Sequence, residues 1–202
     1  MISMDQSALT KQEMYKIMIG TVIPRPIALV ATLGEQGRLS GPFSFSNIVS
    51  YKPPLTSISI QRKNGQLKDT TANILRTKEA VVHSVSKSIL KSVNETAREL
   101  APDESELNYT DFDLMMSETM KTPGILQALA RFETILHQHI PIQDEEGQIV
   151  ADLLLLKIQH LHLSETVYQN SYILADQLEP MSRLAGNDYA ELGEKTTMER
   201  PK

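Results

Sequence analysis

Strand-like segments follow one another along this sequence without a regular helix between each pair. Short apolar or alternating runs of this kind lie at 26–33, 41–51, 55–61, 80–85, 131–140 and 149–163. Parallel strands require long crossover connections, usually helices, whereas antiparallel strands need only short turns. The order therefore predicts a mainly β fold, a closed or nearly closed barrel with a few short peripheral helices, and it disfavours a doubly wound α/β sheet.

Polar turns that contain glycine join two pairs of these segments. Residues 34–37 and 143–148 have the composition of tight turns, so each pair is expected to form a hairpin. A chain of 202 residues is long enough for one domain with a proper core and only marginally long enough for two. We therefore expect a single domain over residues 1–202, ending in a tail at 195–202.

Three segments have helical patterns. Apolar residues at spacings of three and four predict helices over 5–19 and 86–100. A shorter helix is expected to begin with Asp69 or Thr70 as its cap. The acidic and irregular run at 101–113 is expected to be a surface loop or a lid.

The composition excludes several kinds of site. There is no cysteine, so disulfides, thiolate metal sites, iron–sulfur clusters and cysteine nucleophiles are all excluded. The 20 Lys and Arg residues against 25 Asp and Glu give a formal net charge of -5, which offers no broad attraction for nucleic acid or for an anionic membrane. The glycine motifs of dinucleotide-binding and P-loop proteins are absent, as is a nucleophile elbow.

Neither the N-terminal segment nor the longest apolar stretch has the pattern of a membrane or export signal. The first 20 residues carry charges where a secretory signal would need an apolar block, so a cytoplasmic location is expected. The apolar stretch at 149–158 contains Asp152 and Lys157, and it is shorter than the roughly 20 residues that a membrane helix requires. We expect it to be a core strand.

Hydroxyl and amide side chains gather at 44–47, which reads Ser-Phe-Ser-Asn. Alternation places Ser44 and Ser46 on one face of their strand and the neighbouring phenylalanines on the other, and the segment at 55–61 likewise carries hydroxyls on one face. These groups can give directional hydrogen bonds to a ligand rich in carbonyls and ring nitrogens. Ordinary polarity at the end of a half-exposed strand explains the same pattern.

A cationic loop precedes the short helix. Arg62, Lys63 and Lys68 flank a glycine, and threonines follow at the helix start. Charge-assisted hydrogen bonds, free backbone N–H groups and the helix dipole would together suit a phosphate. Asp69 would cap the helix or orient Lys68. A solvated loop before an ordinary capped helix is the alternative.

The histidines give a weaker signal. Two pairs are spaced by two residues, so that in a strand both members face the same way: His137 with His139, and His160 with His162. No matched carboxylate cluster accompanies them in the sequence, so polar pairs on a wet face are favoured over a metal site. His83 lies in an apolar strand and is expected to be a core or interface residue.

Several motifs together resemble one known family. These are the Pro-Arg-Pro at 24–26, the Pro-Phe-Ser-Phe-Ser-Asn block at 42–47, the Pro-Pro-Leu at 53–55, the Lys-Asp-Thr at 68–70 and the segment RLAGNDYAELGE at 183–194. From Thr21 to Glu194 the chain resembles the flavin reductase-like family of FMN-binding split β-barrels, which includes flavoredoxins. The motifs are far more specific together than any one of them alone.

The resemblance implies that FMN binds non-covalently across the barrel at the interface of a homodimer. The cofactor-binding residues that it implies here are Ser44, Phe45, Ser46, Asn47, Ser59, Gln61, Arg62, Lys68, Asp69, Thr70, Arg183 and Tyr189. Of these, 44–47 would touch the isoalloxazine and ribityl chain, and 68–70 would hold the phosphate. The resemblance identifies no metal and no catalytic side chain, although His83 and His160 are candidates to relay a proton.

The resemblance also implies an activity. Hydride from NAD(P)H would pass to the bound FMN, and electrons would then pass to free flavin or to an electron-acceptor protein. One alternative is a flavoredoxin-type electron carrier, or flavin-holding module, with no nicotinamide site. Another is a barrel with an altered pocket that binds a different planar ligand, such as haem.

Overall fold

The computed structural model describes residues 1–34, 41–98 and 106–201. Most of the predicted turn at 34–37, the end of the predicted helix at 86–100 and the first part of the acidic run at 101–113 lie outside these residues. No helix among the described residues has both the length and the apolar character needed to cross a membrane.

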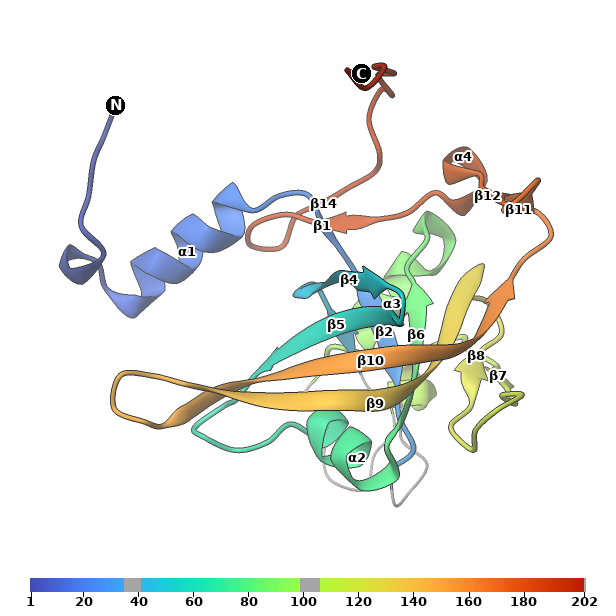
Figure 1. Ribbon diagram of the computed structural model, residues 1–202, viewed down its shortest axis with the longest axis horizontal. Coiled ribbons are helices and arrows are strands. Elements are labelled where there is room, and N and C mark those ends of the chain that lie inside the picture. Colours follow the sequence, from blue (N-terminus) through green and yellow to red (C-terminus); the bar gives the residue numbers. More distant parts are fainter. Residues whose placement is uncertain (35–40, 99–105, 202) are drawn as a thin grey trace.

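A seven-stranded antiparallel sheet forms the body of the molecule and curls into a half-barrel (Figure 1). Its order is β3-β2-β6-β9-β10-β5-β4. The strands are β2 (Ala28–Ala31), β3 (Pro42–Phe43), β4 (Ser46–Tyr51), β5 (Pro54–Gln61), β6 (Glu79–Ser84), β9 (Ala130–Gln143) and β10 (Ile149–Leu163). All neighbours in this sheet pair antiparallel, which confirms the predicted mainly β split-barrel fold.

Smaller elements surround this sheet. A second sheet has the order β1-β13-β14, built from β1 (Arg25–Pro26), β13 (Ser182–Arg183) and β14 (Tyr189–Ala190). Two further pairs are β7 (Leu114–Met115) with β8 (Gly124–Ile125), and β11 (Tyr168–Gln169) with β12 (Tyr172–Ile173). The helices are η1 (Gln6–Ala8), α1 (Lys11–Thr21), α2 (Asp69–Thr77), η2 (Lys87–Ile89), α3 (Leu90–Glu95), η3 (Glu106–Tyr109) and α4 (Ala175–Leu178).

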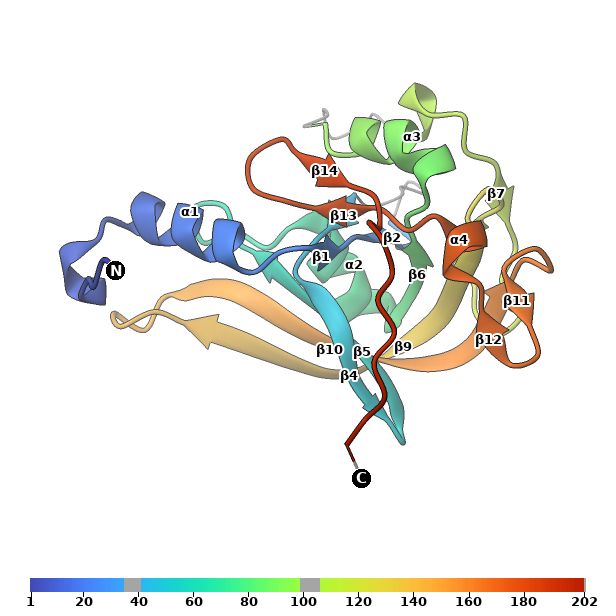
Figure 2. The same ribbon diagram turned by 90° about the horizontal axis from the view of Figure 1, so that it is seen from above.

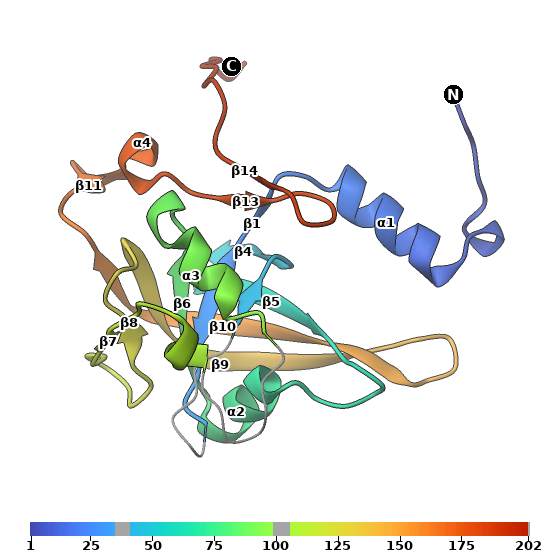
Figure 3. The same ribbon diagram turned by 180° about the vertical axis from the view of Figure 1, so that it is seen from behind.

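The core lies on both faces of the sheet, which explains the unbroken apolar run of β2. Ala28 and Val30 pack into one cluster with Ile58 of β5 and Ile74 of α2. The alternate residues of β2 face a second cluster that includes Val93 of α3. Figure 1 and Figure 3 show α2 and α3 at separate places against the sheet, and each contributes a side chain to a different one of the two clusters. The predicted alternation of 55–61 is confirmed, because its isoleucines are buried.

Alternation through 41–51 breaks where the sequence analysis expected one continuous strand. The chain bends at Ser44 and Phe45, between β3 and β4. Consequently Ser44 and Phe45 line the same cavities instead of pointing to opposite faces. Ile48, the next large apolar residue, is 81% exposed on β4.

The helix boundaries also differ from the predicted ones. α1 begins at Lys11 rather than near Asp5, because Thr10 and Glu13 form a reciprocal capping box. α2 has Lys68 at its N-cap, without a side-chain cap bond, so neither Asp69 nor Thr70 is the cap.

The helix predicted over 86–100 is shorter than expected in the structure. It consists of the 3-10 turn η2 followed by α3, which ends at Glu95. The described part of the acidic run at 101–113, predicted as a surface loop or a lid, is anchored to the core, since Phe112 is buried there and Leu107 packs against it.

Two buried polar residues attach the β7–β8 segment to the sheet. The Glu133 carboxylate, fully buried on β9, accepts hydrogen bonds from the backbone N–H groups of Glu118 and Thr119, from the Thr119 hydroxyl and from His162. Burial alone raises a carboxyl pKa, but these bonds outweigh it and hold the pKa of Glu133 at about 2. His83 accepts from the Ile125 N–H at 2.9 Å. The predicted core position of His83 is therefore confirmed.

We expect His83 to make the protein sensitive to mild acid. Its Nε2 accepts a hydrogen bond, so Nδ1 must donate to the Leu29 carbonyl and the ring is neutral. Burial, with the charges of Arg131 and His162, lowers the pKa of His83 to about 4. The unfolded chain therefore binds this proton first, and stability falls by about 1.4 kcal/mol per pH unit between the ordinary pKa of 6.5 and about 4.

Urea unfolding at pH 7 and pH 5 checks this expectation. The His83→Gln variant is expected to be less stable than the parent at pH 7 but to lose less stability on going to pH 5. An equal loss in both proteins would show that another group causes the acid sensitivity.

Candidate functional site

Two adjoining cavities lie where the end of α1, the bend at 44–45 and the small β1-β13-β14 sheet come together. The larger has a volume of about 370 Å³ and the smaller about 260 Å³. Both are lined by Ile19, Arg25, Ser44 and Phe45, so one wall separates them. We call the larger one the serine cavity and the smaller one the arginine cavity.

The serine cavity has one polar wall and one apolar wall. Its polar wall consists of Ser44, Ser46 and Asn47 near the start of β4, with Ser57 and Ser59 on the neighbouring β5. Its apolar lining consists of Met18, Val22, Pro24, Phe45 and Leu153, the last of which lies beside Ser59 on the neighbouring strand β10. A planar ligand with ring nitrogens and carbonyls along one edge suits such a cavity.

Most of the hydroxyl groups in the serine cavity are free to bind a ligand. In the described ranges, Ser44, Ser46 and Ser59 form no side-chain hydrogen bond, while the Ser57 hydroxyl donates to the Asn47 carbonyl at 3.3 Å. The Asn47 side-chain oxygen accepts from the Ile48 N–H, which leaves its amide nitrogen free. Three hydroxyls and one amide therefore face the cavity with unused hydrogen-bonding capacity.

Arg25 forms the wall between the cavities and joins three segments of the chain. One terminal nitrogen donates to the carbonyls of Ile19 and Val22 at the end of α1, and the other donates to the Leu184 carbonyl at 2.7 Å. A cation at a helix C-terminus satisfies the carbonyls that lack helical partners. Arg25 is 93% buried, its Nε has no partner, and in the described ranges it pairs with no carboxylate.

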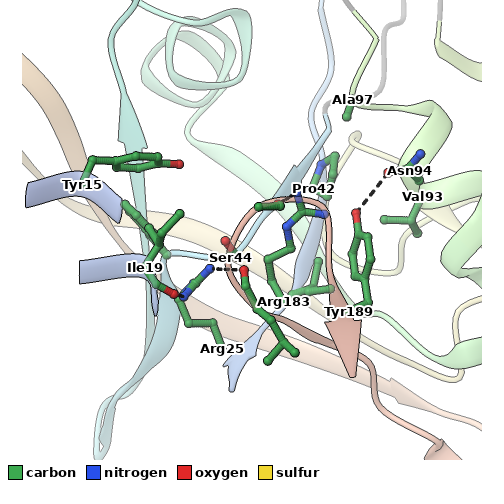
Figure 4. A pocket seen from close by; sticks show the side chains of 14 residues that line it. Tyr15, Ile19, Arg25, Pro42, Ser44, Val93, Asn94, Ala97, Arg183 and Tyr189 are labelled. Carbon is green, nitrogen blue, oxygen red and sulfur yellow. Dashed lines mark hydrogen bonds between the residues drawn. The ribbon is translucent and has the colours of Figure 1, made fainter. Parts of the chain in front are cut away.

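The arginine cavity is shown in Figure 4. Tyr15 enters from α1 on one side, and Arg183 and Tyr189 enter from the β13–β14 hairpin on the other. The Arg183 guanidinium lies 4.4 Å from the centre of the Tyr189 ring. The Tyr189 hydroxyl donates to the Asn94 side-chain oxygen at 3.0 Å, which ties the hairpin to α3.

The predicted site residues fall into three groups. Ser44, Phe45, Ser46, Asn47 and Ser59 line the serine cavity. Arg183 and Tyr189 line the arginine cavity only. Gln61, Arg62, Lys68, Asp69 and Thr70 line neither of these two cavities.

The third group lies at the end of β5 and the start of α2. Gln61 is exposed at the end of β5, while Thr70 is buried in the first turn of α2. Arg62 makes a two-pronged ion pair with Asp152, at 2.8 and 2.9 Å, and this raises the pKa of Arg62. Two of the three guanidinium nitrogens of Arg62 are therefore already bonded to a carboxylate.

The paired histidines each bind a buried carboxylate through one member. His139 donates to Asp152 and His162 donates to Glu133. Burial raises the pKa of Asp152, but the bonds from Arg62 and His139 hold it below its usual value. Within the described ranges, no three His, Asp or Glu side chains gather as metal ligands would. His83 and His160, the predicted proton relays, line neither cavity.

Sequence reasoning did not identify every residue of this site. Arg25 was noticed only as part of the Pro-Arg-Pro motif, and Met18, Leu153 and Asn94 were not identified at all. An arginine between two prolines, just before an apolar strand, was the available signal for Arg25. Met18 and Leu153 look like ordinary apolar residues of a helix and a strand, so only the tertiary structure shows their role.

Comparison with known proteins places the chain in a family. The model of the flavin reductase like domain matches residues 19–179, most of the chain. The chain belongs to this family. It is 47% identical to the uncharacterized protein YwrF of Bacillus subtilis (strain 168), over 96% of each chain. The resemblance inferred from the sequence motifs is thereby confirmed.

Two solved structures extend the comparison to three dimensions. The nitrilotriacetate monooxygenase component B from Bacillus cereus is 39% identical with a TM-score of 0.95, covering 98% of both chains. The 2-nitrobenzoate 2-nitroreductase NbaA of Pseudomonas fluorescens is 26% identical with a TM-score of 0.87, covering 99% of this chain and 96% of the other. Family and structural neighbours make this chain a flavin-linked oxidoreductase of the split-barrel type.

Proposed function

We propose that this chain binds FMN non-covalently in the serine cavity and transfers electrons from NAD(P)H through it. The observation that carries the proposal is a set of donors in a largely apolar cavity that have no partner among the described residues: Ser44, Ser46, Ser59 and the Asn47 amide. Isoalloxazine is a flat ring with carbonyls and nitrogens along one edge, and ribityl carries hydroxyls. The donors in the cavity therefore match the chemistry of the cofactor.

The phosphate is proposed to bind at the start of α2. Lys68 is the N-cap residue and in the described ranges its ammonium group has no bonded partner. The first backbone N–H groups of α2 lie at the positive end of the helix dipole, which favours an anion. Arg62 contributes positive charge nearby, although most of its hydrogen-bonding capacity serves Asp152.

The protein's part in the reaction is to bind and orient. When bound, FMN supplies the hydride-accepting chemistry. The hydroxyls of the serine cavity fix the ring edge, and Met18, Val22 and Leu153 exclude water from its face. Arg25 places a positive charge in the shared wall, which favours the negative charge that the ring gains on reduction.

Anaerobic stopped-flow mixing of the FMN-loaded protein with NADH, and separately with NADPH, tests the proposed reaction. Fast bleaching of the flavin band with either nucleotide supports a reductase, and the faster nucleotide is the preferred donor. Absence of bleaching with both would contradict the reductase proposal in favour of an electron carrier or flavin-holding module. Adding free flavin, or a candidate acceptor protein, to the reduced protein then identifies the acceptor by the rate at which the bound flavin reoxidises.

We also propose that the chain is a homodimer. α1 extends to the same side as the β9–β10 hairpin, away from the core, and only Ile19 of this helix is buried (Figure 1, Figure 2). On the edge strand β4, Ile48 is 81% exposed and Tyr51 is 91% exposed. An edge strand and a projecting helix that both expose large apolar side chains are typical of surfaces that another chain covers. A second copy is the simplest such partner.

Substituting Tyr51 with aspartate is expected to convert the dimer to a monomer, because the charge would be buried in the contact between subunits. Light scattering coupled to gel filtration measures the change in mass. Tyr172→Asp is the matched control, since Tyr172 is also an exposed tyrosine (74%) but lies on β12. A monomeric parent protein, or a Tyr51→Asp variant that stays dimeric, would contradict the proposal.

A further inference from the structure

The arginine cavity is electropositive and has no acidic lining. Two arginines, Arg25 and Arg183, reach it, and no Asp or Glu side chain is part of its described lining. Neither guanidinium pairs with a carboxylate in the ranges that the structure describes. The cavity therefore has a surplus of positive charge, in a chain whose overall net charge is -5.

The burial of Arg25 makes this surplus energetically significant. A buried cation is costly unless a charge or a full set of hydrogen bonds compensates it. Backbone carbonyls accept hydrogen bonds from both terminal nitrogens of Arg25, but within the part of the chain that the structure describes no carboxylate balances its charge and Nε has no partner. An anion in the adjoining cavity would supply the missing negative charge.

Arg183 is held in place before any ligand arrives. Its guanidinium stacks on the Tyr189 ring and one of its nitrogens donates to the Gly186 carbonyl. Tyr189 is in turn fixed by Asn94, whose amide nitrogen has no partner among the residues that the structure describes. A guanidinium with restricted freedom loses less entropy on binding a carboxylate or phosphate. The tyrosine rings of the cavity add flat surfaces on which a ring can stack.

We propose that the arginine cavity is a second ligand site, which binds the anionic group of a ring-bearing co-substrate, and that Arg183 is its specificity-determining residue. The anion is the phosphate of a nucleotide electron donor or the carboxylate of an aromatic electron acceptor. This proposal rests on the proposed function, in that the serine cavity is reserved for the flavin. Arg183 and Tyr189 then belong to this second site rather than to the flavin site that the family resemblance implies for them.

Calorimetric titrations of the full-length protein, with and without FMN, test the proposal. The probes are 5′-AMP and benzoate, each compared with its uncharged counterpart, adenosine and benzamide. At least one anion is expected to bind about tenfold or more tightly than its neutral counterpart, as one charge-assisted contact implies. Preference for 5′-AMP identifies a nucleotide as the source of the anion, and preference for benzoate identifies an aromatic acid.

Variants assign the effect to Arg183. Arg183→Gln is expected to lose the preference for the anion, Arg183→Lys to retain part of it, and Arg200→Gln, in the exposed C-terminal tail, to retain all of it. Tyr189→Phe keeps the ring but loses the bond to Asn94, so it is expected to retain anion binding.

Three results would overturn the proposal. The first is equal binding of the charged and neutral probes, and the second is an unchanged anion preference in Arg183→Gln. The third is a loss of that preference in Tyr189→Phe as large as in Arg183→Gln, because the effect would then come from loosening the β13–β14 hairpin rather than from the Arg183 charge. The FMN affinity of Arg183→Gln is expected to stay within about twofold of the parent; a large loss would return Arg183 to the flavin site. Anion binding by a protein that does not bind FMN would refute the proposed function and leave this site standing.

Discussion

Replacing Glu133 with glutamine is expected to lower the free energy of unfolding by about 3 kcal/mol or more. Both carboxylate oxygens accept hydrogen bonds from groups on the β7–β8 segment and on β10, and the side chain is fully buried. Glutamine retains one acceptor oxygen and turns an NH₂ group toward N–H and O–H donors, so at least one donor loses its partner. The melting temperature should fall by about 6–12 °C.

Two other glutamates provide matched controls for this prediction. Glu79 is half-buried and accepts hydrogen bonds from Lys121 and Thr122, so Glu79→Gln should destabilise less than Glu133→Gln. Glu165 is exposed on a turn, and Glu165→Gln should have no measurable effect. Thermal and urea unfolding at pH 7 give the ranking, and equal stability of the Glu133 and Glu165 variants would refute the role given to Glu133.

Removing the three free hydroxyls of the serine cavity is expected to weaken FMN binding by about 100-fold. Ser44, Ser46 and Ser59 have no intramolecular partner in the described ranges, so each is available to the ligand. One hydrogen bond contributes about 1 kcal/mol, and about 3 kcal/mol corresponds to slightly more than 100-fold in affinity. For the same reason the triple alanine variant should fold with unchanged stability in the absence of flavin.

Ser57 is the matched control within the same cavity. Its hydroxyl already donates to the Asn47 carbonyl, so Ser57→Ala should change the FMN dissociation constant little. Quenching of flavin fluorescence during titration measures both variants. An unchanged affinity in the triple variant, or an equally large loss in Ser57→Ala, would contradict flavin binding through these three hydroxyls.

The positions of the main strands and much of the core could be predicted from the sequence because they depend on local patterns. The alternation of 55–61 and the apolar run of β2 each correspond to a strand whose burial follows the pattern. The cap of α2 was wrong by one or two residues, because Asp69 and Thr70 are good caps by type but the chain turns into the helix at Lys68. The capping propensity of a residue does not determine at which residue the preceding loop ends and the helix begins.

The site was predictable only in part, for a physical reason. Hydroxyls in a strand-end motif indicated the 44–47 lining, whereas Met18 of α1 and Leu153 of β10 reach the same cavity from segments that are distant in sequence. The pairing of Arg62 with Asp152 joins residues 90 positions apart, and no local pattern indicates it. Arg183 could be linked to a ligand from the motif, but its separation from the serine cavity depends on where the β13–β14 hairpin packs.

The visible absorption spectrum of the purified protein, recorded after adding FMN and removing the excess by desalting, tests the central claim most directly. We expect flavin bands to stay with the protein at about one FMN per chain. Filling the cavity by Ser59→Phe is expected to abolish this retention while the circular dichroism spectrum stays unchanged. Flavin that washes away completely, with no quenching of its fluorescence when protein is added back, would contradict the account.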